Sequence, residues 1–287
     1  MSHYLDFITK NKLNNNYLAY AERWFAPALK NTLLHQNETS PFFLGINGAQ
    51  GSGKSTLAEW LKVTIESTSP LNVIIVSLDD FYLSKHARQT LATEIHPLLK
   101  TRGVPGTHDL EHAITVFSAL KKGLSCKIPR FNKLLDDIEP QEKWQNINGP
   151  VDIVIFEGWC VGCPPQFYHQ LNKDVNALET QFDKNKEWRV FVNEQLKGYQ
   201  TWFAYIDHLW MLQAPSFASI FAWRKQQEEL LAAHAPEQSF MNDEHLAFFI
   251  QHYQRLTEHS LLYTPQHAQE IYHLDNNRQI ISHESKL

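Results

Sequence analysis

One segment, Gly48-Ala-Gln-Gly-Ser-Gly-Lys-Ser55, constrains the fold of this chain more than any other. It matches the pattern G-x-x-x-x-G-K-[ST], and it lies between a strand predicted at residues 41–46 and a helix predicted from about residue 55 to 67. Glycines in such a loop let backbone N–H groups approach phosphate oxygens without a clash from a Cβ atom. The N-terminus of the following helix adds the positive end of a dipole. The segment therefore predicts a site for a nucleoside triphosphate.

The residue types of this loop also predict its cofactors, which are ATP and Mg²⁺. We expect Lys54 to reach the β- and γ-phosphates, and we expect the Ser55 hydroxyl to hold the magnesium ion. The predicted nucleotide-binding residues are Gly48, Ala49, Gln50, Gly51, Ser52, Gly53, Lys54, Ser55 and Thr56.

The composition of the chain excludes several other classes of protein. Of its 287 residues 43% are hydrophobic and 20% are charged, so the chain can bury a large core. A formal net charge of −5 gives no basic footprint for nucleic acid, and no apolar run approaches the ~20 residues of a membrane span. The N-terminal residues do not resemble a signal peptide, and three cysteines do not suggest a disulfide framework. We expect a cytoplasmic protein without a nucleic-acid, membrane or obligate protein partner.

Short apolar strands alternate with helical patterns along the chain. Such alternation predicts an α/β fold, a three-layer sandwich in which helices cover both faces of a parallel sheet of about five strands. Residues 1–40 form a predicted helical extension, and residues 41–287 form the nucleotide-binding domain with a helical excursion at residues 164–207. The predicted strands lie at residues 41–46, 72–77, 151–156, 209–213 and 270–274.

Three classes of protein share this phosphate-binding loop: GTPase switches, motor-type ATPases and small-molecule kinases. A GTPase carries N-K-x-D for guanine, but Asn132-Lys-Leu-Leu135 and Asn172-Lys-Asp-Val175 both lack the final aspartate. A motor ATPase ends a strand in Asp-Glu, whereas the strand here ends in Phe156-Glu-Gly158. These differences favour a small-molecule kinase.

Two acidic residues, Asp79 and Asp80, follow the strand at residues 72–77. Ligands of open parallel sheets bind at the carboxyl ends of the strands, and a carboxylate there can take the proton of an attacking hydroxyl. The alternative for either residue is a solvated turn or a helix N-cap. Two acidic residues at this edge therefore predict an acceptor site beside the phosphate loop.

Six further motifs follow in order, and with the phosphate loop they resemble the plant-type D-glycerate 3-kinase family of P-loop kinases. That family is similar to the uridine kinase, phosphoribulokinase and bacterial pantothenate kinase group. The resemblance spans about residues 42–280. The motifs are Leu78-Asp-Asp-Phe-Tyr82, Arg102-Gly-Val-Pro-Gly-Thr-His-Asp109, Pro129-Arg-Phe-Asn-Lys133, Glu157-Gly-Trp159, Trp223-Arg-Lys-Gln-Gln-Glu228 and Met241-Asn-Asp-Glu244.

This resemblance implies roles for the reacting groups. Asp79 matches the catalytic base of the group, with Asp80 the second choice. Glu157 matches the carboxylate that ends the Walker B-like strand, near Mg²⁺ or the acceptor. Arg224 matches the arginine of a helical lid, which would occupy residues 217–260 with the helices that follow. The expected Mg²⁺ ligands are Ser55, Asp79 and Glu157.

The resemblance also places an acceptor pocket in the remaining motifs. Glycerate carries a carboxylate, so its pocket should contain Arg, Lys or His, and an acidic residue could accept a hydrogen bond from a hydroxyl. For each basic residue the alternative is an ordinary surface charge. The predicted pocket residues are Asp80, Tyr82, Arg102, His108, Asp109, Arg130 and Lys133.

The function implied is transfer of the γ-phosphate of ATP to a hydroxyl of D-glycerate, which gives 3-phosphoglycerate. The alternatives are a kinase of a sugar, a nucleoside or a pantothenate-like acceptor, and a regulatory ATPase without an acceptor. Cys160 and Cys163 form a C-x-x-C pair, for which two packed thiols are expected rather than a metal or redox site. His245, His252 and His259 recur every seven residues and are expected to form a solvated stripe on a helix.

Overall fold

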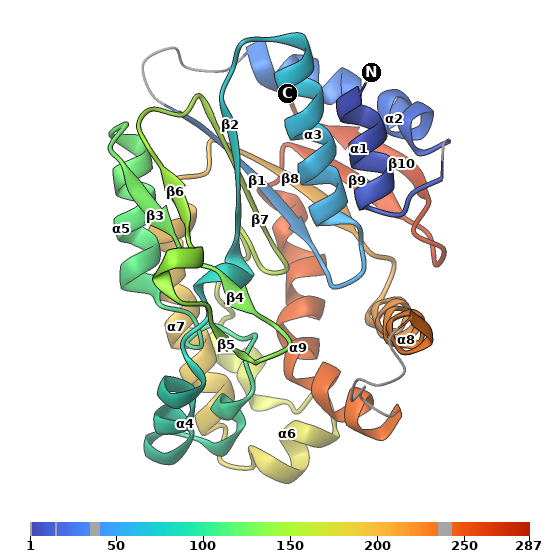
Figure 1. Cartoon of the computed structure of the whole chain (residues 1–287). Coiled ribbons are helices and arrows are strands. Elements are labelled where there is room, and N and C mark those ends of the chain that lie inside the picture. The colour runs from blue at the N-terminus through green and yellow to red at the C-terminus, as the bar shows by residue number, and fades with distance from the viewer. Residues whose placement is uncertain (1, 15, 35–40, 235–242) are drawn as a thin grey trace.

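The computed structural model describes residues 2–14, 16–34, 41–234 and 243–287, and Figure 1 shows its course. Within these ranges the central sheet has six strands in the order β10-β9-β8-β1-β7-β2. The neighbours from β9 to β2 are parallel, and β10 is antiparallel to β9. The strands are β1 (Phe42–Gly48), β2 (Val73–Ser77), β7 (Ile153–Gly158), β8 (His208–Gln213), β9 (Glu270–Leu274) and β10 (Ile280–Ser285).

Helices cover both faces of the sheet, so the predicted three-layer α/β sandwich is confirmed (Figure 1). Burial on both faces explains why all six residues of β7 are buried and why the inner strands are continuous apolar runs. Helices α1 (Ser2–Lys10), α2 (Tyr17–Leu34) and α3 (Lys54–Thr68) share one hydrophobic core with the sheet, and α5 (Leu110–Lys121), α7 (Glu187–Phe203) and α9 (Asp243–Tyr263) share the other.

The remaining elements are short or lie outside the sheet. None of the described helices is both long and apolar enough to cross a membrane. Two small strand pairs are β3 (Cys126–Ile128) with β6 (Gln145–Ile147) and β4 (Phe131–Asn132) with β5 (Asp137–Ile138). The other helices are α4 (Lys85–Glu94), α6 (Ala177–Phe182) and α8 (Phe217–His234), with short 3-10 helices at η1 (Leu78–Phe81), η2 (Pro97–Lys100), η3 (Gln141–Lys143), η4 (Tyr168–Asn172) and η5 (Thr264–Gln266).

The five predicted strands are confirmed, but the sequence analysis missed β10. This edge strand is mostly exposed and polar, and it therefore lacks the apolar run that marks the inner strands. Residues 276–278 lie between β9 and β10.

The N-terminal helices pack on the same core as the sheet. Phe25 of α2 contacts Trp60 and Tyr272 with ring centroids 5.9 and 4.9 Å apart. The expected end of this extension, at residue 40, lies outside the described residues, and so do Met241 and Asn242 of the last motif.

The histidines of α9 correct the expectation of a solvated stripe. His245 is exposed, but His252 and His259 are only 3% and 5% exposed. Burial lowers the pKa of both rings to about 4. α9 packs against α6 and against the core that it shares with α5 and α7. The histidines that recur every seven residues therefore lie mostly on the buried face of the helix.

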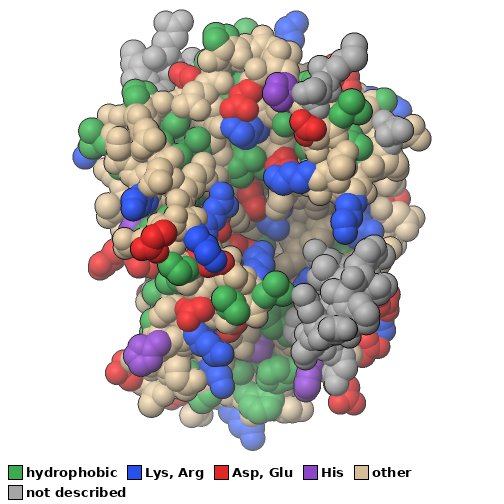
Figure 2. All heavy atoms as spheres, viewed as in Figure 1, with side chains coloured by type: hydrophobic (Ala, Val, Ile, Leu, Met, Phe, Trp, Pro, Cys, Tyr) green, Lys and Arg blue, Asp and Glu red, His purple; other side chains and the backbone are tan. Residues whose placement is uncertain are grey.

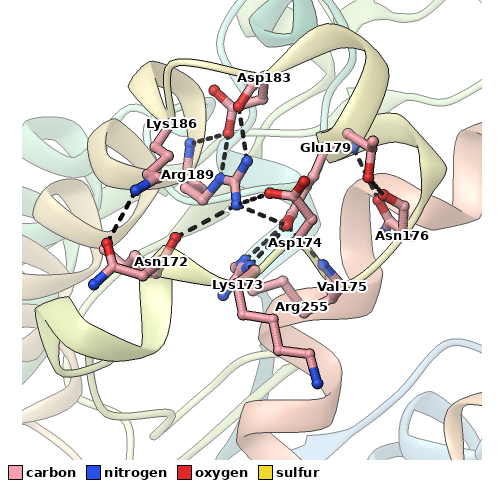
Figure 3. A network of polar contacts seen from close by, with 12 residues as sticks. Asn172, Lys173, Asp174, Val175, Asn176, Glu179, Asp183, Lys186, Arg189 and Arg255 are labelled. Atoms are coloured by element: carbon pink, nitrogen blue, oxygen red, sulfur yellow. Dashed lines mark hydrogen bonds and ion pairs between the residues drawn. The ribbon is translucent and has the colours of Figure 1, made fainter.

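Buried ion pairs join the helical excursion to α9 (Figure 3). Glu179 of α6 is completely buried, and its two oxygens lie 2.6 and 2.7 Å from the guanidinium of Arg255 on α9. Arg189 of α7 lies 3.4 Å from Glu179 and 2.7 Å from Asp183. Because each buried charge has an opposite partner, the network holds α6, α7 and α9 in one arrangement.

Replacing Glu179 by Gln should lower the free energy of unfolding by about 3 kcal/mol or more, because it leaves the buried Arg255 guanidinium without its counter-charge. Urea unfolding measures the change. Glu194→Gln is the matched control, since Glu194 on α7 pairs with Lys197 at the surface and should change stability little. Equal stabilities for the two variants would contradict this role for the network.

Candidate active site

The carboxyl ends of β1, β7 and β2 meet at one edge of the sheet. The parallel register pairs Asn47 with Gly158 and Ser77 with Glu157, so the segments that follow these strands start side by side. The phosphate loop follows β1, Glu157 lies in β7, and η1 with both aspartates follows β2. The topology therefore gathers the predicted site residues that lie far apart in the sequence.

The phosphate loop has the backbone that its glycines predict. Gly51 has a φ of +78°, and a Cβ atom there would lie 3.0 Å from the Cβ atom of Trp223 on α8. Gly53 precedes α3 with a φ of +94°. The loop thus turns tightly into the start of α3 and passes directly beneath α8.

Glu157 connects the three strand ends through hydrogen bonds. The hydroxyls of Ser55 and Ser77 donate to Glu157 Oε1 over 2.9 and 3.1 Å, and Lys54 Nζ lies 4.0 Å from Glu157 Oε2. Within the described residues, Glu157 Oε2, Ser52 Oγ and Gln50 Oε1 are buried without a hydrogen-bond partner. Unsatisfied buried groups of this kind around a phosphate loop fit a polar ligand, and the Ser55 and Glu157 oxygens are hard donors suited to Mg²⁺.

Asp79 is held by two donors. The Tyr82 hydroxyl donates to its Oδ1 over 2.9 Å, and Lys133 Nζ donates to its Oδ2 over 2.6 Å. Burial alone would raise the pKa of Asp79, but the ammonium groups of Lys133 and Lys54 outweigh it and hold the pKa well below its ordinary value. Asp79 is therefore an ionised carboxylate, and its direct partners differ from those of Ser55 and Glu157.

Asp80 has separate partners. Its Oδ2 lies 3.3 Å from Arg130 Nη1, and the backbone N–H of Phe131 donates to its Oδ1 over 3.3 Å. Burial, partly opposed by Arg130, raises the pKa of Asp80 to about 6. Neither aspartate is the N-cap of η1, because Ser77 occupies that position and accepts from the backbone N–H of Asp79.

The acidic and basic groups of this region lie around a recessed surface. A cleft of about 960 Å³ runs along β2, and Ser55, Ser77, Asp80, Arg130 and Glu157 line its inner end. Figure 2 shows blue and red side chains gathered around the hollowed centre of the same face. Ser55 and Glu157 of the nucleotide side and Asp80 and Arg130 of the acceptor side thus border space that small molecules can enter.

Residues 130–138 form a hairpin that carries two of the predicted basic residues. Arg130 pairs with Asp80 at its start, and Lys133 reaches Asp79 from its turn. Near its end Asp136 pairs with Arg102, and it lies 3.0 Å from the buried guanidinium of Arg88. The sequence analysis missed Asp136 and Arg88, because their partners lie more than 30 residues away and no spacing signals them.

The Arg102–Asp109 loop is shaped by aromatic side chains. Tyr253 of α9 donates to the Arg102 carbonyl over 2.9 Å, and Trp159 donates to the Gly103 carbonyl over 3.1 Å. Gly103 has a φ of +136°, and a Cβ atom there would lie 2.2 Å from the Tyr253 hydroxyl. Tyr253 is a further site residue that the sequence analysis missed, since nothing in the helical pattern distinguishes it from a core residue.

His108 is buried among aromatic rings and does not supply the positive charge expected of it. Its ring stacks on Tyr82 with centroids 4.4 Å apart, and its Nδ1 lies 2.7 Å from the Tyr199 hydroxyl. Burial lowers the pKa of His108 to about 3, so the ring is neutral at pH 7. The stacked His108 ring packs against Tyr82, and the Tyr82 hydroxyl donates to Asp79.

Asp109 also differs from the expectation. Its side chain is exposed, and its Oδ1 accepts from the backbone N–H of His112 over 3.0 Å as the N-cap of α5. This hydrogen bond gives the aspartate a structural role at a helix start. We therefore no longer count Asp109 among the residues expected to bind the acceptor.

Arg224 lies on α8 next to Trp223, the residue that packs against Gly51 of the phosphate loop. Burial and Asp79 raise the pKa of the Tyr253 hydroxyl, and the charges of Arg102 and Arg224 oppose that rise. Arg224, Arg102 and Asp79 thus act electrostatically on the same hydroxyl.

The two cysteines after Trp159 are packed thiols, as expected. Cys160 and Cys163 are free and completely buried, and burial raises the pKa of Cys163 to about 12. Across the described ranges, no group of three or more His, Cys, Asp and Glu side chains is arranged to hold a metal ion.

Known proteins resemble this chain in sequence and in fold. Residues 43–163 match the Phosphoribulokinase / Uridine kinase family. The chain is 37% identical over 226 residues to the "Uncharacterized kinase mug58" of Schizosaccharomyces pombe, covering 75% of this chain and 79% of that protein. It is 32% identical over 232 residues to the chloroplastic D-glycerate 3-kinase of Arabidopsis thaliana, covering 76% of this chain. The chain belongs to the glycerate 3-kinase-like family of P-loop kinases.

This family membership agrees with the three-dimensional comparison. A solved structure of D-glycerate 3-kinase from Cryptococcus neoformans has the same fold, with a TM-score of 0.75 and 24% identity over 91% of this chain and 96% of that one. The chain spans 47% of the plant protein's length. As a P-loop kinase of this family, the protein is an ATP-dependent phosphotransferase. Its cytoplasmic location stays a prediction, since the plant relative is a chloroplast protein.

The burial of His108 predicts a specific pH behaviour. In the folded protein the ring should stay neutral from pH 8 to pH 5, whereas in urea it should protonate near pH 6.5. The unfolded state then binds a proton that the folded state excludes. Stability should therefore fall below pH 6.5, by at most about 1.4 kcal/mol per pH unit from this residue, down to its folded pKa. Imidazole ¹⁵N NMR measures both states, and a folded-state midpoint near 6.5 would contradict the burial argument.

Proposed function

We propose that this kinase transfers the γ-phosphate of ATP to the 3-hydroxyl of D-glycerate, with 3-phosphoglycerate and ADP as products. The observation that carries the proposal is the position of Asp79. It is an ionised carboxylate that feels the charge of Lys54 in the phosphate loop, Lys133 of the hairpin contacts it, and Arg130 of the hairpin pairs with the neighbouring Asp80. A proton acceptor between a nucleotide site and a basic pocket suits an acceptor that carries both a hydroxyl and a carboxylate.

On the nucleotide side, residues 48–56 bind the phosphates of ATP. Lys54 neutralises charge on the β- and γ-phosphates, and Ser55 and Glu157 hold Mg²⁺, which when bound neutralises further charge. The unsatisfied Glu157 Oε2 and the hydrogen bond between Ser55 and Glu157 support this assignment. Asp79 makes no hydrogen bond to Ser55 or Glu157 within the described residues, where its partners are Tyr82 and Lys133, and we assign it to the acceptor instead.

On the acceptor side, Asp79 takes the proton of the attacking hydroxyl. Tyr82, supported by His108, orients the carboxylate, while Arg102, Arg130 and Lys133 make the pocket positive. Asp80 holds the start of the hairpin that carries Arg130 and Lys133. Arg224 reaches from the lid and, with Lys54, stabilises charge on the phosphoryl group in transfer.

A direct test compares two aspartates of this region. Asp79→Asn should lower kcat for glycerate-dependent ADP formation by about 10²-fold or more, because the amide cannot accept the proton. Binding of Mg·ATP, measured by calorimetry, should persist. Asp109→Asn is the matched control, since asparagine caps a helix as well as aspartate does.

The proposed function fails if wild-type enzyme forms no ADP in response to glycerate while glycerol, uridine or pantothenate accelerates ADP formation. It also fails if ATP turnover ignores every hydroxyl compound. A fully active Asp79→Asn variant overturns the role of Asp79 as base.

A further inference from the structure

Both oxygens of the Asp79 carboxylate already hold a donor. Oδ1 accepts from the Tyr82 hydroxyl and Oδ2 from Lys133 Nζ. A hydroxyl that is to give its proton to Asp79 must reach one of these oxygens. Tyr82 is buried and stacked on His108, which is bonded in turn to Tyr199, so the donor on Oδ1 is fixed. Of the two donors, the one at Oδ2 is therefore the one that can move aside for an acceptor hydroxyl.

Lys133 can move without disturbing the backbone that carries it. Its side chain is 60% exposed, and it belongs to a turn in which Asn132 Oδ1 accepts from the backbone N–H groups of Leu134 and Leu135. The two ends of the hairpin are held separately, by Asp80 at Phe131 and by Arg88 at Asp136. A fixed turn with a flexible four-carbon stem lets the ammonium group change partners.

The other hairpin-side cations have structural partners. Arg130 pairs with Asp80, and Arg102 pairs with Asp136, so each of these ion pairs helps to hold the hairpin in place. The pair between Lys133 and Asp79 joins an exposed side chain to the proposed base. Breaking it releases a reacting group and leaves the two anchors of the hairpin intact.

We propose, on the basis of the proposed function, that Lys133 exchanges its contact with Asp79 for a contact with the carboxylate of the acceptor. The bound acceptor then places its hydroxyl at the vacated Oδ2. The hydroxyl oxygen bonds to the γ-phosphorus, the bond from that phosphorus to the bridging oxygen of ADP breaks, and the hydroxyl proton passes to Asp79. ADP leaves with the electrons of the broken bond.

This exchange makes Lys133 both a specificity residue and a cover for the base. An acceptor without a carboxylate has no negative charge to replace Asp79 as the partner of the Lys133 ammonium group. Acceptors that carry a carboxylate are therefore selected. Without any acceptor, Lys133 stays on Oδ2, and water cannot use Asp79 to attack the γ-phosphate. One side chain thus couples recognition of the substrate class to protection of ATP.

Replacing Lys133 by Met tests both consequences in the full-length enzyme. ATP hydrolysis without acceptor should rise severalfold, and KM for glycerate should rise about tenfold or more through loss of the charged contact. Lys133→Arg should change both quantities less than Lys133→Met does, because it retains the positive charge. Lys143→Met is the control: Lys143 is 64% exposed and pairs with Glu139 at 2.8 Å, away from Asp79.

The hydrolysis gained in Lys133→Met should disappear when Asp79→Asn is added, since the exposed base is then absent. Wild-type enzyme is measured with glycerate first. If it fails to phosphorylate glycerate, the proposed function fails. If the wild type is active but Lys133→Met leaves either the hydrolysis rate or the KM unchanged, the exchange alone is overturned.

Discussion

The hydrogen bonds that converge on Glu157 unite the ends of three neighbouring strands. Ser55 follows β1, Ser77 ends β2, and Glu157 lies in β7, so a single buried carboxylate touches a residue from each of the other two segments. The parallel register makes this meeting possible, because it brings all three carboxyl ends to one edge. The nucleotide site, the proposed base and the acceptor pocket all depend on that edge.

The acceptor side is built from segments that the sheet alone does not position. The Arg102–Asp109 loop is held by Trp159 and by Tyr253 of α9, and the hairpin at residues 130–138 is held by Asp80 and Arg88. α9 is fixed in turn by the buried ion pairs around Glu179 (Figure 3). A network remote from the phosphate loop therefore supports the geometry of the acceptor pocket through one helix.

The parts that the sequence predicts well are those with local signals. Inner strands are covered on both faces and are therefore mostly apolar, and the phosphate loop requires glycines at fixed positions. β10 escaped prediction because an exposed edge strand needs no apolar run. His108 and Asp109 are adjacent in one motif, yet one is buried against Tyr199 and the other caps α5 at the surface. Contacts between distant segments decide such differences, and a single sequence does not display them.

The central claim, that this sheet edge directs a phosphoryl group onto a hydroxyl of glycerate, can be tested by following the phosphorus atom itself. The enzyme is incubated with Mg·ATP and D-glycerate carrying ¹³C at carbon 3, and ³¹P NMR follows the reaction. The account predicts that the γ-phosphate signal is replaced by a phosphomonoester signal coupled to that carbon. Inorganic phosphate as the only new signal, or a phosphomonoester without this coupling, would contradict it.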